Sequence, residues 1–301
     1  RVYADIEIKL TMGNTMLRTA CKALLATVIL AMPIAEASEK SLAVRLDALV
    51  QEGMSRTQTQ GLAIAVIDDG KVELVKTWGR RNGNGDPLTA DTVMYGASLT
   101  KAVFAYTVMQ LAQEGKIDLD TPIASYLPKP LPEYTEEEEK YAAWQYLAGD
   151  ERWRQLTPRM LLTHSSGFSN FGFLEPDGKL KFHFDPGARY AYSGDGLILL
   201  QFVIERGLGI DVGMEMQRRV FDRFGMPNTS MIWRPDFANN LADGWKADGS
   251  IEPHDERSKT RAAGSMDTTI ADFAKFSAGY IRGDGLTEKS RRELTAPQLP
   301  I

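Results

Sequence analysis

Cysteine and histidine are both scarce in this sequence. Its 301 residues contain one cysteine, Cys21, so the chain can form no internal disulfide and no zinc site made of several cysteines. The three histidines, His164, His183 and His254, lie far apart, and none belongs to an H-E-x-x-H or comparable metal-ligand spacing. We therefore expect no metal site and no cofactor.

An excess of basic residues is also absent. The chain has 35 Lys and Arg against 40 Asp and Glu, which gives a net charge of −5. A protein that binds nucleic acid or an anionic membrane surface usually carries a basic patch that shifts this balance, so we expect no nucleic-acid partner. The composition, 43% apolar and 25% charged, is typical of a soluble globular protein of one or two domains.

The apolar run Ala23–Ile34 is too short to span a bilayer, which needs about 20 residues. Met16-Leu17-Arg18 precedes the run and Ala35-Glu36-Ala37 follows it, and these are the parts of a secretory signal peptide. A buried N-terminal helix would explain the apolar run, but neither the basic start nor the Ala-x-Ala end. We therefore expect a signal peptide over residues 16–37 and a periplasmic or secreted protein, with no stable membrane insertion after cleavage.

Cleavage after Ala37 would leave residues 38–301 as one domain. It would also remove Cys21, so thiol chemistry is excluded from the mature protein. The chain begins with Arg, and we expect residues 1–15, which precede the signal peptide, to be upstream or added sequence outside the fold.

Hydrophobic periodicity and turn residues predict an α+β fold. Asp69-Gly70 separates two runs rich in β-branched residues, which predicts a hairpin over Leu62–Ile67 and Val72–Trp78. Leu99–Glu114 is apolar on most faces and is followed by glycine, which predicts a buried helix. Early strands followed by many helices do not favour regular βαβ alternation. The other predicted helices are Leu42–Glu52, Pro158–Thr163, Gly196–Arg206, Val212–Phe224, Ile270–Ile281 and Thr287–Leu294.

One S-x-x-K tetrapeptide, Ser98-Leu99-Thr100-Lys101, lies at the start of the predicted buried helix. Residues three apart share a helix face, so Lys101 can reach the hydroxyl of Ser98. A serine at a helix N-terminus also lies where free N–H groups stabilise an oxyanion. The pattern alone fits equally well a Ser98 that caps the helix and a Lys101 on the surface.

A serine nucleophile in this sequence needs a base other than histidine. No G-x-S-x-G elbow is present, and His164 is better explained as a residue that fixes its loop. The remaining bases are Lys101 and a tyrosine, whose pKa must fall by ~3 units, worth ~4 kcal/mol, to act near pH 7. Tyr192, in the Gly-rich turn Ala191–Gly196, is the candidate, although the pattern alone is better explained by a packed aromatic residue in a turn. Lys101 and Tyr192 brought close together could share one proton.

The segments around Ser98 and Tyr192 belong to a longer series of ordered motifs. These are Ser98-Leu99-Thr100-Lys101, Leu161–Gly167, Pro186-Gly187, Tyr192-Ser193-Gly194, Ala262–Met266, Thr268-Thr269 and Asp272-Phe273. Together they resemble the serine β-lactamase/penicillin-binding protein superfamily, and in particular its class C-like branch of CubicO-type peptidases and family VIII-type esterases. The resemblance extends from about Leu42 to the end of the chain.

This resemblance implies a β-lactamase/transpeptidase-like fold. In that fold an antiparallel sheet flanked by helices meets a mainly helical domain, and the active site lies between them. Ser98 matches the nucleophile, Lys101 the proton-transferring lysine and Tyr192 the tyrosine of the Tyr-x-Asn motif. Ser193 and Gly194 then become substrate-binding positions. The implied substrate is a small-molecule ester or amide, or a cell-wall peptide.

The sequence departs from this pattern in two places. Gly194 stands where the motif has Asn, so the side-chain amide that holds a substrate amide is missing. No Lys/His-x-Gly motif occurs between Tyr192 and Ile301, so we expect the third motif and the C-terminal strands of the sheet to lie beyond this sequence.

The sequence therefore predicts an exported serine hydrolase that acts on an ester or amide carbonyl through an acyl-enzyme, with esterase activity favoured. A penicillin-binding or D-amino-acid peptidase and a β-lactamase are alternatives within this class. A peptidoglycan-binding module without turnover is an alternative of another class.

Overall fold

The computed structural model describes residues 42–135 and 140–299. Contacts divide the chain into two units, Arg1–Thr59 and Gln60–Ile301. In the first unit residues 42–57 are helical, so the helix predicted from Leu42 extends five residues further than expected. The predicted signal peptide over residues 16–37 and the segment 1–15 lie outside the described residues and stay predictions.

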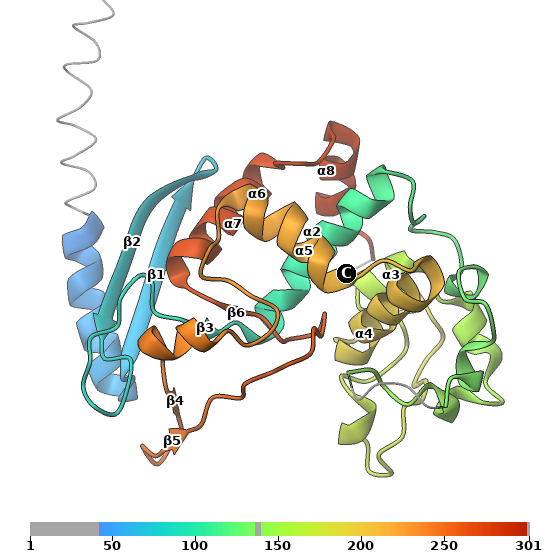
Figure 1. Ribbon diagram of the computed structural model, residues 1–301, viewed down its shortest axis with the longest axis horizontal. Coiled ribbons are helices and arrows are strands. Elements are labelled where there is room, and N and C mark those ends of the chain that lie inside the picture. The colour runs from blue at the N-terminus through green and yellow to red at the C-terminus, as the bar shows by residue number, and fades with distance from the viewer. Residues whose placement is uncertain (1–41, 136–139, 300–301) are drawn as a thin grey trace, which may run out of the picture. The chain divides into compact units, whose positions relative to one another are not determined.

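The second unit begins with the predicted hairpin. Strands β1 (Gly61–Asp68) and β2 (Lys71–Gly79) pair antiparallel, with an irregularity between Val66 and Ile67. Asp69 and Gly70 both have positive φ, 44° and 70°, which is the backbone of the tight turn that Asp-Gly favours. Helix α7 (Ile270–Arg282) packs against both strands (Figure 1).

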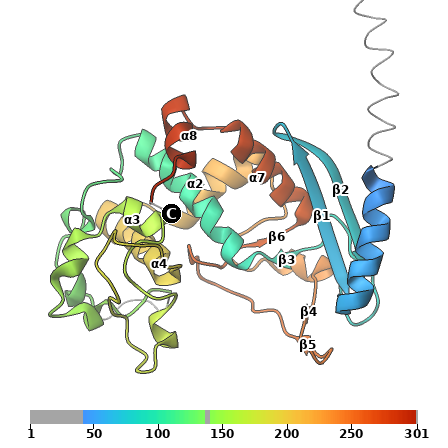
Figure 2. The same cartoon turned by 180° about the vertical axis from the view of Figure 1, so that it is seen from behind.

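Helix α2 (Thr100–Gln113) is the buried helix predicted over Leu99–Glu114. Ten of its 14 residues are buried, and Gly115 follows its C-cap with the left-handed φ of 71° that ends many helices. A single 3-10 turn, η1 (Ala97–Leu99), leads into it. Within the second unit, α2 has the hairpin and α7 on one side and α3 and α4 on the other (Figures 1 and 2).

The remaining predicted helices are also present, and their ends agree within two residues. Two of them continue into or through a π-helical turn, at Val203–Gly207 and Gln217–Phe221. The helices are α3 (Pro158–Leu162), α4 (Gly194–Phe202), α5 (Val212–Met216), α6 (Asp222–Phe224) and α8 (Glu288–Thr295).

Two further strand pairs were not predicted. Strand β3 (Met94–Tyr95) pairs antiparallel with β6 (Asp267–Thr268), and β4 (Gly244–Trp245) pairs with β5 (Ile251–Glu252). Strands of two residues are too short to show alternation in a sequence. The β3–β6 pair matters for the site, because it brings the start of α2 next to residues 262–268. The fold is the predicted mixture of helices and antiparallel strands.

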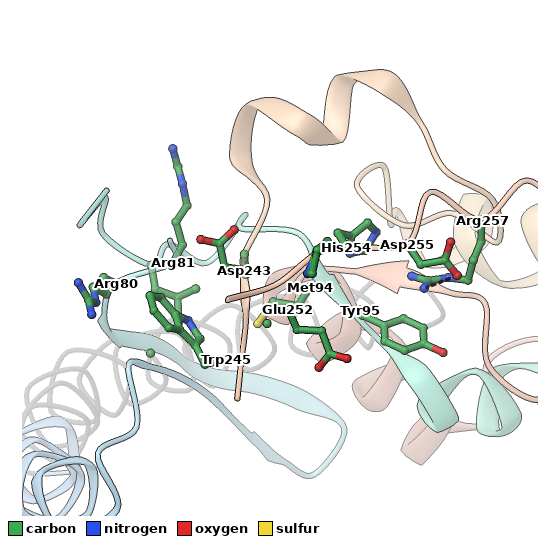
Figure 3. Close-up of a pocket in the computed structure, with 15 residues that line it drawn as sticks. Arg80, Arg81, Met94, Tyr95, Asp243, Trp245, Glu252, His254, Asp255 and Arg257 are labelled. Atoms are coloured by element: carbon green, nitrogen blue, oxygen red, sulfur yellow. Dashed lines mark ion pairs between the residues drawn. The ribbon is translucent and has the colours of Figure 1, made fainter. Parts of the chain in front are cut away.

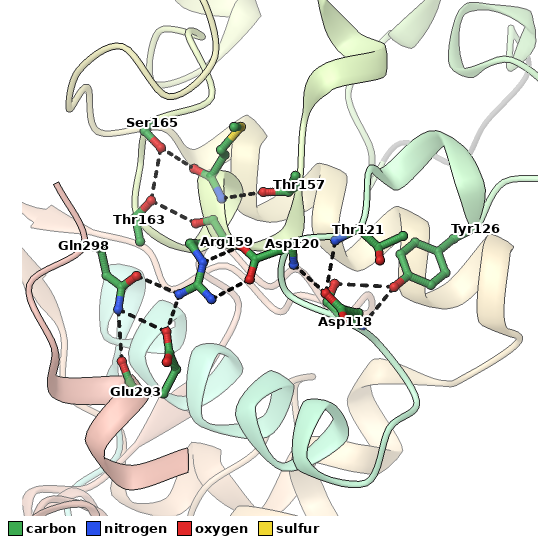
Figure 4. A network of polar contacts seen from close by, with 11 residues as sticks. Asp118, Asp120, Thr121, Tyr126, Thr157, Arg159, Thr163, Ser165, Glu293 and Gln298 are labelled. Carbon is green, nitrogen blue, oxygen red and sulfur yellow. Dashed lines mark hydrogen bonds and ion pairs between the residues drawn. The ribbon is translucent and has the colours of Figure 1, made fainter. Parts of the chain in front are cut away.

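Arg159 at the start of α3 ties distant parts of the chain together (Figure 4). Its Nε and Nη2 donate to the two carboxylate oxygens of Asp120 at 2.6 and 2.8 Å. Its Nη1 donates to Glu293 on α8 and, at 2.7 Å, to Gln298. This network fixes the helix that leads directly into residues 163–167.

None of the helices in the described part of the chain is both long enough and apolar enough to cross a membrane.

Candidate active site

Ser98 lies at a strained turn of the backbone. The residue before it, Ala97, has a φ of 43°, a left-handed conformation that costs a non-glycine residue ~1–2 kcal/mol. The turn is held by Gly96 N, which donates to Met266 O at 2.8 Å, and by Thr100 Oγ1, which donates to Ala97 O at 2.6 Å. Ser98 itself is exposed and its side chain caps neither η1 nor α2, so the capping alternative is wrong.

Lys101 is buried, with 8% of its surface exposed, so the alternative that places it on the surface is wrong as well. Its Nζ donates to Ser98 Oγ at 3.0 Å and to the carbonyl oxygen of Ala263 at 2.5 Å. The second contact could not be predicted, because any residue type offers a backbone carbonyl. The amine is held between the serine and the segment that follows β5.

Tyr192 lies next to Lys101, although the two residues are far apart in the sequence. Lys101 Nζ lies 4.9 Å from the centre of the Tyr192 ring. Burial alone would raise the pKa of Tyr192, but hydrogen bonds with Lys101 and Ser98 and the charge of Lys101 together lower it below its ordinary value of 10. The three residues predicted to carry the chemistry therefore lie together, and the tyrosine is shifted in the direction that a base needs.

His164 lies against Tyr192, with ring centres 4.6 Å apart. Its Nδ1 accepts a hydrogen bond of 3.0 Å from the backbone N–H of Ser193. Burial, together with the positive charge of Lys101, lowers the pKa of His164 to about 4, so this imidazole is neutral at pH 7. These contacts agree with the interpretation of His164 as a residue that fixes its loop.

Ser193 and Gly194 both form hydrogen bonds within the protein. The buried Ser193 hydroxyl accepts from Gly196 N at 2.9 Å and so caps α4, while Gly194 N donates to Asn170 O at 2.8 Å and to Asn170 Oδ1 at 3.0 Å. A Cβ on Gly194 would lie only 2.2 Å from the ring of Phe171. Gly194 therefore leaves room for an aromatic ring, and its φ is not what requires glycine. Substrate binding by these two residues stays a prediction.

Asp195 is a buried carboxyl that the sequence did not single out. It is 3% exposed, and its Oδ2 accepts a hydrogen bond of 2.6 Å from Gly172 N. Burial raises its pKa to about 6, although the bond from Gly172 and the charge of Arg261 act in the opposite direction. Asp195 fixes the loop around Phe171 to the first turn of α4.

The lining of a cavity of about 580 Å³ does not include Ser98, Lys101 or Tyr192. Tyr95 and Arg257 lie at one end of it, and Arg80 and Trp245 at the other (Figure 3). The Tyr95 hydroxyl donates at 2.7 Å to the carbonyl of Gly264, the neighbour of the residue that binds Lys101. Tyr95, which lines the cavity, therefore contacts the segment that binds Lys101. Within residues 42–135 and 140–299 no group of three or more His, Cys, Asp or Glu side chains could hold a metal ion.

Residues 46–300 match the profile of the Beta-lactamase family, and the chain therefore belongs to that family. It is 27% identical to lovastatin esterase of Penicillium rubens, over 66% of this chain and 56% of the esterase. It is 24% identical to the putative penicillin-binding protein PbpX of Bacillus subtilis, over 70% of this chain and 51% of PbpX. The chain thus spans about half the length of these curated relatives.

Solved structures show the same fold. The octameric penicillin-binding protein homologue from Pyrococcus abyssi superposes with a TM-score of 0.68 at 21% identity, over 86% of this chain and 61% of that one. A class C beta-lactamase gives 0.68 at 20% identity, over 86% and 70%. The β-lactamase/transpeptidase-like fold and the family resemblance that the motifs predicted are confirmed.

Proposed function

We propose that this protein is a serine hydrolase that cleaves esters through an acyl-enzyme. The observation that carries the proposal is the position of Lys101 Nζ, 3.0 Å from Ser98 Oγ, 2.5 Å from Ala263 O and 4.9 Å from the centre of the Tyr192 ring. An exposed hydroxyl next to a buried amine and a tyrosine of lowered pKa is an activated nucleophile.

In the first half of the reaction, Ser98 Oγ forms a bond to the carbonyl carbon while the Tyr192–Lys101 pair accepts the hydroxyl proton. The bond from that carbon to the leaving-group oxygen breaks, and the pair returns the proton to this oxygen, which releases an alcohol. In the second half, water attacks the acyl-serine, its proton passes by the same route to Ser98 Oγ, and a carboxylic acid leaves. The backbone N–H of Ser98, at the start of η1, supplies one donor to the oxyanion.

Two observations support an ester over an amide. Gly194 offers no side-chain amide to a substrate, and Phe171 fills the space next to it. Among the relatives, lovastatin esterase and the esterase EstB of Burkholderia gladioli carry esterase names; EstB is 28% identical, over 46% of this chain and 32% of EstB. The proposed substrates are small-molecule esters, and export to the periplasm or outside the cell follows from the signal peptide predicted over residues 16–37.

A D-amino-acid peptidase or penicillin-binding protein is the second candidate. It is favoured by the likeness to PbpX and to a structure titled D-alanine carboxypeptidase AmpC from Burkholderia cenocepacia, which has a TM-score of 0.67 at 22% identity over 85% of this chain and 68% of that one. In this case cell-wall peptides would be the substrates. A module that is acylated but not turned over would release no product after the first equivalent.

The test is a panel of p-nitrophenyl esters, a chromogenic cephalosporin and D-Ala-terminated peptides, assayed with the complete protein and its Ser98→Ala variant. A fluorophosphonate or fluorescent penicillin should label Ser98, as located by mass spectrometry. Label on another serine, or unchanged hydrolysis by Ser98→Ala, would end the proposed mechanism. Turnover of peptides above esters would favour the second candidate, and a single burst without turnover would favour the binding module.

A further inference from the structure

His164 holds both residues that flank Tyr192. Its carbonyl oxygen accepts a hydrogen bond of 2.8 Å from Ala191 N, and its Nδ1 accepts one of 3.0 Å from Ser193 N. Its ring lies 4.6 Å from the Tyr192 ring, with 33° between the two planes. One residue thus contacts the tyrosine ring and the backbone on both sides of it.

The Tyr192 side chain also contacts the other residues of the site, through hydrogen bonds with Lys101 and Ser98. It is 37% exposed, and it lies in the irregular segment 188–193 before α4. On the C-terminal side the Ser193 hydroxyl caps α4. The two hydrogen bonds that Ala191 N and Ser193 N donate to His164 therefore fix the backbone on both sides of Tyr192.

His164 is itself firmly held. Its φ of 55° is left-handed, a conformation that persists only where the surroundings enforce it. Next to it, Ser165 N donates to Met160 O at 2.9 Å and Ser165 O accepts from Gly187 N at 2.7 Å. Helix α3, which leads to it, is fixed by the Arg159 network (Figure 4).

We propose that His164 is a positioning residue for Tyr192, and that it acts through an unprotonated Nδ1 that fixes the Ser193 backbone and through a ring that supports the phenol. The proposal rests on the proposed function, because it assigns His164 a role only if Tyr192 moves protons for Ser98. An Nδ1 that accepts from a backbone N–H has no free lone pair, so His164 is not the base. The proton of the neutral ring is then on Nε2.

The positive charge next to the His164 ring also favours the neutral form of its imidazole. Lys101 is the cation that faces His164, and it helps to lower the pKa of this histidine to about 4. A protonated imidazole would place a second positive charge beside Lys101 and would give up the acceptor for Ser193 N.

Two substitutions separate the two contacts. His164→Asn keeps an acceptor near the position of Nδ1 and tolerates a left-handed φ, but it loses the ring. His164→Phe keeps a ring and loses the acceptor. A misplacement of about 1 Å at a reacting group can cost ~10²-fold in rate, so we expect His164→Phe to lower kcat for ester hydrolysis by ~10- to 100-fold with KM changed less than about threefold. His164→Asn should recover most of that kcat.

Matched controls are the same two substitutions at His183, an exposed histidine that pairs with Glu175 at 2.7 Å, and they should leave kcat and KM unchanged. A folded His164→Phe protein with wild-type kcat would overturn the inference, and so would equal losses in the Phe and Asn variants. If His164→Phe does not fold, ¹⁵N spectra of the wild-type imidazole at pH 7 decide. An Nε2–H tautomer with unprotonated Nδ1 supports the inference, and an Nδ1–H or imidazolium form overturns it.

Failure of the inference is distinguishable from failure of the proposed function. If Ser98→Ala abolishes hydrolysis while His164→Phe does not alter kcat, the serine mechanism stands and only the role of His164 is lost. If Ser98→Ala keeps its activity, the proposed function fails whatever His164 does.

Discussion

The Ala263 carbonyl accepts a hydrogen bond of 2.5 Å from Lys101 Nζ, although the two residues are 162 positions apart. The same amine donates to Ser98 Oγ at 3.0 Å. The backbone around Ala263 reaches this place because β6, which follows it, pairs with β3, which precedes Ser98. The orientation of the amine therefore depends on two segments that meet only in the folded chain.

Replacing Lys101 by methionine should keep the buried aliphatic volume while removing the amine. Proton transfer by a positioned group typically contributes ~10²–10⁴-fold, so we expect kcat/KM for p-nitrophenyl esters to fall by that factor. The thermal midpoint should change far less than it would for a cavity, since methionine fills the site. Esterase kinetics and thermal unfolding of Lys101→Met measure the two effects. Wild-type kcat/KM in a folded Lys101→Met protein would remove Lys101 from the mechanism.

The pH dependence of hydrolysis should report Tyr192. Its pKa is lowered below the ordinary value of 10, so the phenolate forms, and kcat/KM rises, as the pH increases through a pKa below 10. Tyr192→Phe should lower kcat/KM and remove this rising limb. In Lys101→Met the limb should move to higher pH, because the hydrogen bond and the charge that lower the pKa are gone. A rising limb that persists unchanged in Tyr192→Phe would belong to another group.

The helices and the hairpin could be predicted because their signals are local. The apolar run of α2 ends before Gly115, and Asp69-Gly70 has the backbone that its turn requires. Ser98 and Lys101 were predicted from their spacing on one helix face. Tyr192 was predicted from the order of the family motifs, since no local pattern distinguishes it from a packed aromatic residue.

The rest of the site depends on contacts that leave no pattern in a sequence. The Ala263 carbonyl binds Lys101 through a backbone atom that every residue type has. Phe171 lies 23 positions before Gly194 in the sequence, and only the folded structure shows that its ring fills the space of a side chain. The strands β3 and β6 have two residues each, which is below the length at which alternation is visible.

Gly194→Asn should destabilise the protein. A Cβ at this position would lie 2.2 Å from the Phe171 ring, so the ring must move out of its place. Overpacking of this kind costs typically ~1–3 kcal/mol, and we expect a lower thermal midpoint and weaker ester hydrolysis. Combining Gly194→Asn with Phe171→Ala should recover stability relative to Gly194→Asn alone. If the single variant is as stable as the wild type, the loop that carries Phe171 adapts and the contact is not tight.

The substrate preference gives an independent prediction. Because Gly194 supplies no side-chain amide, the loss in kcat/KM should be larger for amide substrates than for esters. Esters also have the lower intrinsic barrier to hydrolysis. We expect kcat/KM for short-chain p-nitrophenyl esters to exceed that for a chromogenic cephalosporin by a wide margin. Both rates should vanish in Ser98→Ala. The reverse ranking would refute the esterase assignment while leaving Ser98 as nucleophile.

Asp195 should make stability depend on pH in a defined direction. Its pKa in the folded protein is about 6, above the ordinary 3.8, so the folded state binds more protons than the unfolded state between these values. By linkage, its contribution to stability is fully present below pH 3.8 and is lost as the pH rises through about 6. Asp195→Asn cannot ionise, and its amide oxygen can still accept from Gly172 N.

The Asp195→Asn variant should therefore match the wild type near pH 4 and become more stable than it above pH 7. The expected gain in the free energy of unfolding is on the order of 3 kcal/mol, because folding raises this pKa from 3.8 to about 6 and one pKa unit corresponds to about 1.4 kcal/mol. Denaturant unfolding at both pH values measures it. Asp248→Asn is the control, since hydrogen bonds with Ser250 lower the pKa of that exposed carboxyl and its removal should bring no gain at high pH. A wild type more stable than Asp195→Asn at pH 8 would mean that the ionised carboxylate is compensated, with Arg261 as the charge to test, since it acts to lower this pKa.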